Sequence, residues 1–212
     1  MKKIITLLFA FLCMTISCPA QNAKSILDKT AATFTQKGII KASFTVKNFI
    51  GQKQHGETFS GSIILNGKKF RLNAQGIITW FDGKTQWTFV PENEEVNITE
   101  PTDEELQTIN PYNFLNFYKN GYNAKMGNTK TFSGKEVYEV QLTAKKSNMD
   151  IKQVVVLVNK ANSQLMQIKF RQGTNNWTNI TVNSFAGNQK LPESTFKFEK
   201  KDAPNAEIID LR

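Results

Sequence analysis

Residues able to do covalent or metal-assisted chemistry are scarce in this chain of 212 residues. It has one histidine, His55, in a predicted polar turn from Gly51 to Gly56, and two cysteines, Cys13 and Cys18. Both cysteines lie in an N-terminal segment that we expect to be removed from the mature protein. A serine hydrolase needs a histidine base, and zinc sites need histidine or cysteine ligands. The inventory therefore argues against both kinds of site.

Paired carboxylates, as in glycosidases, are the chemistry that remains. Each candidate has a simpler structural role: Asp82 shapes a turn, Glu92 to Glu95 form a solvated hairpin tip, and Asp103 to Glu105 complement a helix N-terminus. The acidic cluster also lacks the spaced Asp and Asn pattern of a calcium loop. We therefore expect a protein that is not an enzyme, with no catalytic residue, no metal and no cofactor. The carboxylates considered are Asp82, Glu92, Glu94, Glu95, Glu100, Asp103, Glu104 and Glu105.

The first twenty residues have the pattern of a secretory signal peptide. A positive start at Lys2 and Lys3 precedes the apolar run Ile4 to Ile16, which is too short to span a bilayer. Small residues at Cys18 and Ala20 predict cleavage after Ala20, so we expect residues 1–20 to be the signal and 21–212 a single domain. The alternative is a lipid anchor on Cys18. Such a signal usually has a Leu-like residue three positions earlier, where this chain has threonine.

The charge of the chain is positive but thinly spread. The formal net charge of +9 falls to +7 once Lys2 and Lys3 are removed. No run of Lys or Arg exceeds two residues, which argues against dedicated nucleic-acid binding. A mild positive charge on an exported protein either serves solubility or favours approach to anionic lipid surfaces and acidic partners.

A β-hairpin is predicted in the central stretch from Ile77 to Pro101. Asp82-Gly83 tolerates positive φ and separates two runs in which apolar and polar residues alternate, so one strand face is apolar. After it, Thr102 followed by Glu105 is a capping box, which predicts that a helix begins there. The apolar face carries Trp80, Trp87, Phe89, Val96 and Ile98.

The other segments predict one α+β domain. Residues 22–36 are an amphipathic helix ending near Gly38, two short helical segments follow at 102–109 and 111–118, and the last strand contains Phe196 and Phe198. Turns are predicted at 159–163 and 173–176, and a connection at Gly187-Asn188. Roughly ten or eleven strands result, so we expect a strongly curved antiparallel sheet, an open or incomplete β-barrel with the helices across its concave side.

Apolar material is abundant for a protein with one sheet. The chain has 16 phenylalanines and 3 tryptophans. A concave face this aromatic either packs against helices or holds a ligand, and burying each methylene of an acyl chain contributes about 0.8 kcal/mol. Composition alone leaves both possibilities open.

Six short motifs follow one another along the chain. They are Leu27-Asp28-Lys29, Ala42-Ser43-Phe44-Thr45, Phe81-Asp82-Gly83-Lys84-Thr85-Gln86-Trp87 with Pro91, Asn110-Pro111-Tyr112-Asn113-Phe114-Leu115, Ile151-Lys152-Gln153 with Val158, and Phe196-Lys197-Phe198 with Pro204 and Ile209-Asp210. In this order they resemble the LolA family of periplasmic outer-membrane lipoprotein carriers. The DGKT-x-W hairpin of Asp82 to Trp87 is the most specific piece, and the likeness covers essentially all of 21–212.

The resemblance implies an open β-barrel with a central helical lid, in the periplasm. It implies a protein that carries acylated lipoproteins or lipid from an inner-membrane ABC-type release complex to an outer-membrane acceptor, without covalent chemistry. We expect this protein to be a monomer. The acyl-chain trough would be Phe44, Phe59, Ile63, Trp80, Trp87, Phe89, Met166, Ile168 and Phe170. The lid would carry Tyr112, Phe114, Leu115, Phe117 and Tyr118.

One departure from the family concerns how the lid is held. The family has an arginine and a proline before the aromatic hairpin, whereas this chain reads Asn66-Gly67-Lys68-Lys69-Phe70-Arg71, leaving Lys68 or Arg71 as substitutes. Two other functions stay open. One is a lipid-binding sensor domain of the same architecture that docks a membrane signalling partner. The other is an exported glycan-binding or hydrolysing protein that uses Trp80, Trp87 or Trp177 as a sugar platform.

Overall fold

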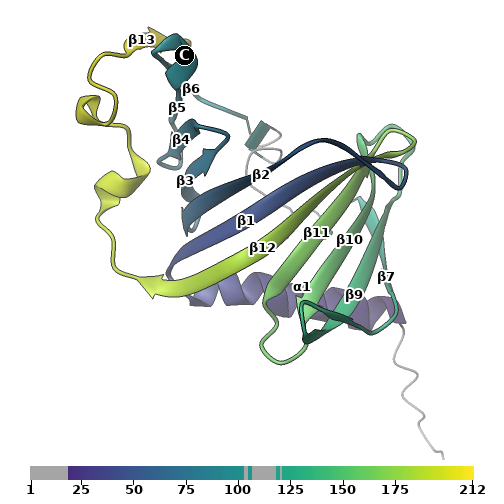
Figure 1. Ribbon diagram of the computed structural model, residues 1–212. Coiled ribbons are helices and arrows are strands. Elements are labelled where there is room, and N and C mark those ends of the chain that lie inside the picture. The colour runs from purple at the N-terminus through teal and green to yellow at the C-terminus, as the bar shows by residue number, and fades with distance from the viewer. Residues whose placement is uncertain (1–18, 103–104, 107–117, 120) are drawn as a thin grey trace, which may run out of the picture.

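The computed structural model describes residues 19–102, 105–106, 118–119 and 121–212. In these ranges one N-terminal helix lies against a large, curved sheet of 13 strands (Figure 1). The described helices include none that is both long and apolar enough to cross a membrane. The elements are α1 (Pro19–Gln36), β1 (Ile39–Ile50), β2 (Lys53–Asn66), β3 (Lys69–Ala74), β4 (Ile77–Phe81), β5 (Gln86–Val90), η1 (Pro91–Asn93), β6 (Glu95–Thr99), β7 (Tyr122–Met126), β8 (Lys130–Phe132), β9 (Lys135–Ala144), β10 (Ile151–Asn159), β11 (Leu165–Gln172), β12 (Asn176–Gln189), η2 (Glu193–Phe196), η3 (Lys200–Asp202) and β13 (Glu207–Asp210).

The sheet is open, as the sequence predicted. Its strand order is β13-β6-β5-β4-β3-β2-β1-β12-β11-β10-β9-β7, and β8 pairs with β9. All neighbouring pairs are antiparallel except β13 and β6, which run parallel. The chain thus leaves β6 for the other half of the sheet and returns to its edge only at β13.

The first hairpin is longer than its sequence suggested. Ile50 pairs with Lys53, so the turn is only two residues long, and Gly51 there adopts a positive φ of 61°. His55 lies on β2 opposite Asn48 and is exposed, so the prediction of a turn extending to Gly56 was wrong. A solvent-exposed strand beside a two-residue turn can consist largely of polar residues. Such a strand lacks the alternation of apolar and polar side chains from which strands are predicted.

The central hairpin is confirmed. Asp82 Oδ1 accepts hydrogen bonds from the backbone N–H groups of Lys84 (3.0 Å) and Thr85 (2.9 Å), and Gly83 has a φ of 105°. The capping box is present as well. The Thr102 backbone N–H donates to Glu105 Oε2 at 2.8 Å, and the Glu105 N–H donates to Thr102 Oγ1 at 3.3 Å.

The N-terminal helix places its apolar residues against the sheet. Ala23 and Leu27 are buried, and buried Thr30 satisfies its hydroxyl by donating to the Ile26 carbonyl oxygen at 2.9 Å. Gly38, with a φ of 54°, ends the helix region as predicted. In Figure 1 this helix, faded by distance, crosses behind the sheet, so the figure is viewed from the opposite face.

Two core clusters share the sheet face beneath α1, which we call the helix face. Phe34 of α1 packs against both clusters and so bridges the two halves of this face. The first cluster has Ala23, Leu27, Tyr118, Tyr122, Ala124, Val140, Leu142, Val154, Val156, Val158, Leu165 and Ile168 as its buried members. The second has Ile40, Ala42, Phe44, Val46, Ile63, Leu65, Phe70 and Phe81.

The C-terminal segment covers part of the other face, which we call the outer face. From the end of β12 it runs along one side of the molecule to β13 beside β6 (Figure 1, yellow). The predicted final strand at Phe196 and Phe198 was wrong, because the chain there makes a 3₁₀ turn after Pro192, and the last strand is β13. Gly187 and Asn188 belong to β12 and are no connection.

Candidate functional site

Five of the nine predicted trough residues lie on the helix face. Paired residues in a ladder share a face, and the register links β2, β1, β12 and β11: Val46 pairs with Phe59 and with Ile180, and Ile180 pairs with Ile168. These five side chains belong to the two clusters beneath α1 and form one apolar band across the sheet. They are Phe44, Phe59, Ile63, Ile168 and Phe170.

A glycine makes room in the middle of this band. Phe44 pairs with Gly61, and its ring lies over the glycine so closely that a Cβ at position 61 would be 2.5 Å from Phe44 Cζ. The same Cβ would be 2.8 Å from the Asn73 carbonyl oxygen. Gly61 therefore sets how deeply the Phe44 ring sits in the sheet.

Three other predicted trough residues point the opposite way. Trp80 pairs with Trp87, and both alternate with helix-face positions, so they lie on the outer face with Phe89. The C-terminal segment covers them: the Phe198 ring packs against Trp80 with centroids 5.6 Å apart and planes at 64°. Trp87 and Phe89 pack on a cluster of Val96, Ala203 and Ala206. Trp80 is 1% exposed, so it offers no sugar platform.

Met166, the ninth predicted trough residue, also packs on the outer face. It is buried with Val137 and Leu157, under Phe132 of the short strand β8. The register between β10 and β11 shifts beside it, at Leu157 and Val158. Such an irregularity turns a side chain to the face that alternation does not predict.

The lid residues are only partly described. Tyr112, Phe114, Leu115 and Phe117 lie outside the described residues. Tyr118 is 2% exposed and packs in the cluster under α1, where its hydroxyl donates a hydrogen bond to the carboxylate of Asp28 on the helix. Burial raises the pKa of the Tyr118 phenol, and the hydrogen bond to Asp28 raises it further. This hydrogen bond joins Tyr118 to α1.

Tyr122, at the start of β7, reinforces the same corner. Its hydroxyl donates to the Ile151 carbonyl oxygen at 3.0 Å, and burial raises the pKa of its phenol. Both phenols therefore stay neutral in the folded protein, and both act as hydrogen-bond donors at the rim of the helix face.

Neither substitute for the family's arginine reaches the helix face. Arg71 lies on the outer face, with its guanidinium carbon 5.4 Å from the centre of the Trp80 ring. Lys68 is exposed in the turn between β2 and β3. Sequence reasoning had no signal for the Tyr118 contact with Asp28, because ninety residues separate the two partners.

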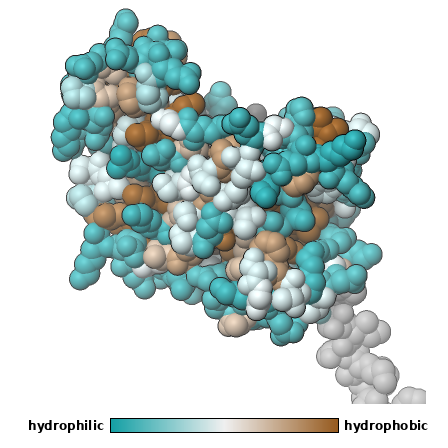
Figure 2. All heavy atoms as spheres, viewed as in Figure 1, coloured by the Kyte–Doolittle hydropathy of each residue, from teal (hydrophilic) through white to brown (hydrophobic). Residues whose placement is uncertain are grey.

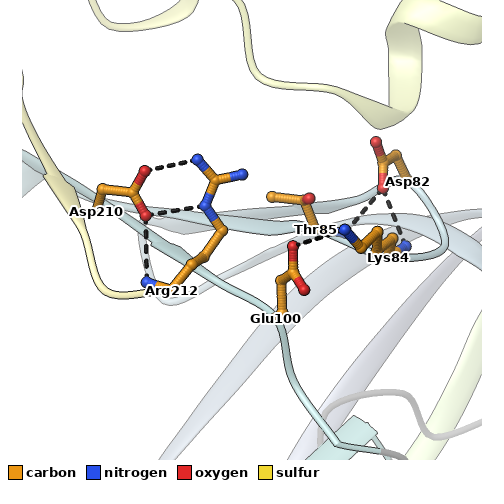
Figure 3. Close-up of polar contacts among 6 residues, drawn as sticks. All are labelled: Asp82, Lys84, Thr85, Glu100, Asp210 and Arg212. Atoms are coloured by element: carbon orange, nitrogen blue, oxygen red, sulfur yellow. Dashed lines mark hydrogen bonds and ion pairs between the residues drawn. The ribbon is translucent and has the colours of Figure 1, made fainter.

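A polar corner that the sequence did not single out lies where β6 meets the C-terminus. Arg212 forms a two-pronged ion pair with Asp210, from Nε to Oδ1 at 2.9 Å and from Nη2 to Oδ2 at 2.6 Å (Figure 3). This pairing lowers the pKa of Asp210 to about 2. Lys84 reaches Glu100 at 3.1 Å in the same view. A cavity of about 630 Å³ adjoins them, lined by Gln86, Thr99, Glu100, Pro101, Glu105, Leu211 and Arg212.

Three of the described candidate carboxylates hold local structure. Asp82 caps its turn, Glu100 pairs with Lys84, and Glu105 completes the capping box, which lowers its pKa. Within the described ranges, no group of three or more His, Cys, Asp or Glu residues is placed to hold a metal ion. The described geometry offers an apolar face under one helix and an open sheet edge.

Comparison with protein families identifies this fold. The family model described as "Outer membrane lipoprotein carrier protein LolA" matches residues 13–174, and the chain therefore belongs to this family. The family is one of carriers and not of enzymes, and membership supports a lipid- or lipoprotein-binding role. No curated protein sequence matches the chain.

Solved structures share the fold at low sequence identity. An uncharacterized conserved protein from Thermus thermophilus has a TM-score of 0.60 at 14% identity, over 90% of this chain and 99% of that one. A DUF1329 family protein from Desulfovibrio piger has a TM-score of 0.50 at 11% identity, over 87% and 99%. LprF from Mycobacterium bovis has a TM-score of 0.50 at 10% identity, over 82% and 97%. At these identities the likeness establishes the fold alone.

Proposed function

We propose that this protein is a periplasmic carrier that shields the acyl chains of lipoproteins against the helix face of its sheet. The observation that carries the proposal is the apolar band from Phe59 through Phe44 to Ile168, in an open sheet of a lipoprotein carrier family. An acyl chain of a dozen methylenes, at about 0.8 kcal/mol each, would gain useful affinity there. A partly exposed side chain such as Phe59 would supply contact area at the entrance.

The proposed route follows from the same family. Residues 1–20 act as the export signal, cleaved after Ala20. The carrier takes its cargo from an inner-membrane ABC-type release complex and gives it to an outer-membrane acceptor. No covalent step is needed, because transfer requires only that the acyl chains move from one apolar surface to another of comparable affinity.

The two faces of the sheet provide a direct test of where the acyl chain lies. All three tryptophans, Trp80, Trp87 and Trp177, lie on the outer face. Bromine on an acyl chain quenches tryptophan fluorescence only at short range. A brominated lipopeptide bound at the helix face should therefore quench the wild-type protein weakly and the F59W variant strongly. Strong quenching of wild type with no added effect in F59W would place the ligand on the outer face instead.

Binding itself is tested by native mass spectrometry of the detergent-free protein with an added lipopeptide. Phe59 and Phe89 are matched, because both are partly buried phenylalanines on strands, on opposite faces. When equal amounts of folded protein are compared, F59Q should lose the bound lipopeptide, whereas F89Q should keep it. A wild-type protein that carries no acyl lipid and accepts no lipopeptide would overturn the proposal.

A further inference from the structure

The outer face holds a groove that the carrier function leaves unused. It has a volume of about 440 Å³ and lies where the β1–β2 turn approaches the turn between β11 and β12. The Gly51 backbone N–H donates to the Asn175 carbonyl oxygen at 2.9 Å and fixes the two turns together. Phe49, Val155 and Trp177 provide its apolar lining, and Lys130, Glu139 and Lys169 its charged lining.

The register shows that these side chains form two adjacent rows across the strands. Phe49 pairs with Trp177, which pairs with Arg171. One step along, Lys47 pairs with Asn179, Asn179 with Lys169, and Lys169 with Val155. One side of the groove is therefore built on four consecutive strands, with Phe49 and Trp177 in one row and Lys47 and Lys169 in the next. Lys130 on β8 and Glu139 on β9 complete its lining.

The charged lining of the groove is positive on balance, with two lysines and one glutamate. Lys130 forms an ion pair with Glu139, so these two charges offset one another. Burial alone would raise the pKa of Glu139, but hydrogen bonds from Lys130 and Gln141 and the charge of Lys169 outweigh it and keep that pKa below its usual value. No described carboxylate lies within ion-pairing distance of Lys47, Lys169 or Arg171. Arg171 instead donates to neutral oxygens, including Gln153 Oε1 at 3.1 Å.

On β1 and β12 the apolar lining lies among polar residues, whereas on β10 it adjoins the outer-face cluster of Val137, Leu157 and Met166. Figure 2 shows the face toward the viewer as mainly hydrophilic and intermediate residues, with separate hydrophobic ones. Neighbouring outer-face pairs are polar, such as Ser43 with Ser184, whose hydroxyl oxygens are 2.6 Å apart. Trp80, on the same face, is covered by Phe198 of the C-terminal segment. Trp177 is partly exposed. Among the described residues, no aromatic ring packs over Trp177 in the way that Phe198 packs over Trp80.

We propose that this groove docks an extended, acidic peptide segment of a partner protein. An apolar side chain of the segment would lie against Trp177 and Phe49, and its carboxylates would meet Lys169 and Lys47. The recessed shape favours a chain over a flat bilayer, because a planar surface reaches the rim of a groove but not its lining. Since the groove and the acyl-chain band lie on opposite faces, a partner and a lipid cargo can bind together.

The test measures binding of two labelled peptides to the purified protein by fluorescence anisotropy. In one peptide Asp and Glu alternate with Phe and Val, and in the other Lys and Arg replace the acidic residues. The acidic peptide should bind more tightly, and the affinity should fall when ionic strength rises, because exposed charges are screened. K169E and W177A should each weaken binding about tenfold. K68E makes the same charge change at the exposed β2–β3 turn and should stay within about twofold of wild type.

Three outcomes would overturn the proposal: equal affinity for both peptides, equal weakening by K169E and K68E, or binding of phosphatidylglycerol vesicles that depends on Lys169 and Trp177 when the acidic peptide does not bind. Circular dichroism checks whether each variant is folded. K169E changes a partly exposed residue, so it still tests the proposal if W177A does not fold. Lipopeptide uptake should be unchanged in K169E. The docking result thus does not depend on the carrier proposal.

Discussion

The phenol of Tyr118 donates a hydrogen bond to the carboxylate of Asp28, and this contact ties Tyr118 to α1. Tyr118 is buried, whereas Asp28 lies on the exposed side of the helix, so the bond spans the rim of the helix face. It is a polar connection at the border of an apolar surface. Its strength therefore bears on how firmly that corner of the fold is held.

The first prediction concerns this bond. Y118F should lower the free energy of unfolding by about 1 kcal/mol, because a hydrogen bond to a solvated carboxylate is lost while the ring stays packed. D28N should cost a similar amount, and the double variant should cost no more than either one. Urea unfolding measures all three. Y138F is the control, and costs that simply add in the double variant would show that the two residues are not coupled.

The second prediction is a pH dependence. The folded-state pKa values of Tyr118 and Tyr122 are raised above the unfolded value of about 10. Their stabilising contribution is therefore complete below about pH 10 and is lost as pH rises above it. Stability measured by urea unfolding should fall between about pH 10 and 11, and less steeply in Y118F. Identical slopes in wild type and Y118F would contradict the burial of this phenol.

The third prediction concerns Gly61. G61A should destabilise the protein by about 1–3 kcal/mol, because the new methyl group meets both the Phe44 ring and the Asn73 carbonyl oxygen. S60A, at the exposed neighbouring position, should stay within about 0.5 kcal/mol of wild type. Thermal and urea unfolding measure both. If the Phe44 ring must move to make room, G61A should cost much less in an F44A background than in wild type. An equal cost in both backgrounds would mean that the contact with the Asn73 carbonyl oxygen causes the destabilisation.

The fourth prediction concerns the cover over the aromatic hairpin. F198A should lower stability by about 2 kcal/mol, since Phe198 is partly exposed and a fully buried phenylalanine costs about 3–5 kcal/mol. It should also shift tryptophan emission to the red, because Trp80 loses its cover. F132A, in a cluster without tryptophan, should destabilise without that shift. An unchanged emission spectrum in F198A would contradict the packing described.

Much of the fold was predictable from local patterns. The hairpin at Asp82-Gly83 follows from turn chemistry, and strict alternation correctly grouped Trp80, Trp87 and Phe89 on one face. Alternation cannot tell which face the helix covers, however. On β4 both faces are buried, with Trp80 1% and Phe81 3% exposed, since the C-terminal segment covers one side and the helix-face core the other. The expected acyl-chain residues therefore divide between two surfaces.

The remaining differences arise from long-range contacts. β13 is a short strand with a charged residue at each end, so it carries no alternating apolar signal, and only its parallel pairing with β6 makes it a strand. Phe196 and Phe198 alternate as a strand would, but Phe196 ends a 3₁₀ turn, and Phe198 just beyond it packs on Trp80, far away in the sequence. Likewise, the charged residues that line the outer groove come from three strands, β8, β9 and β11, and no contiguous motif contains them.

The pairing of β13 with β6 also bears on how the protein reaches its folded state. β6 is synthesised in the middle of the chain and β13 near its end, so the open edge of β6 and the aromatic residues beside it wait for a partner that arrives much later. Contacts so distant in sequence slow folding, and an unpaired edge flanked by exposed tryptophans invites association with other chains. Until β13 docks, this part of the molecule would be a natural client for a holding chaperone.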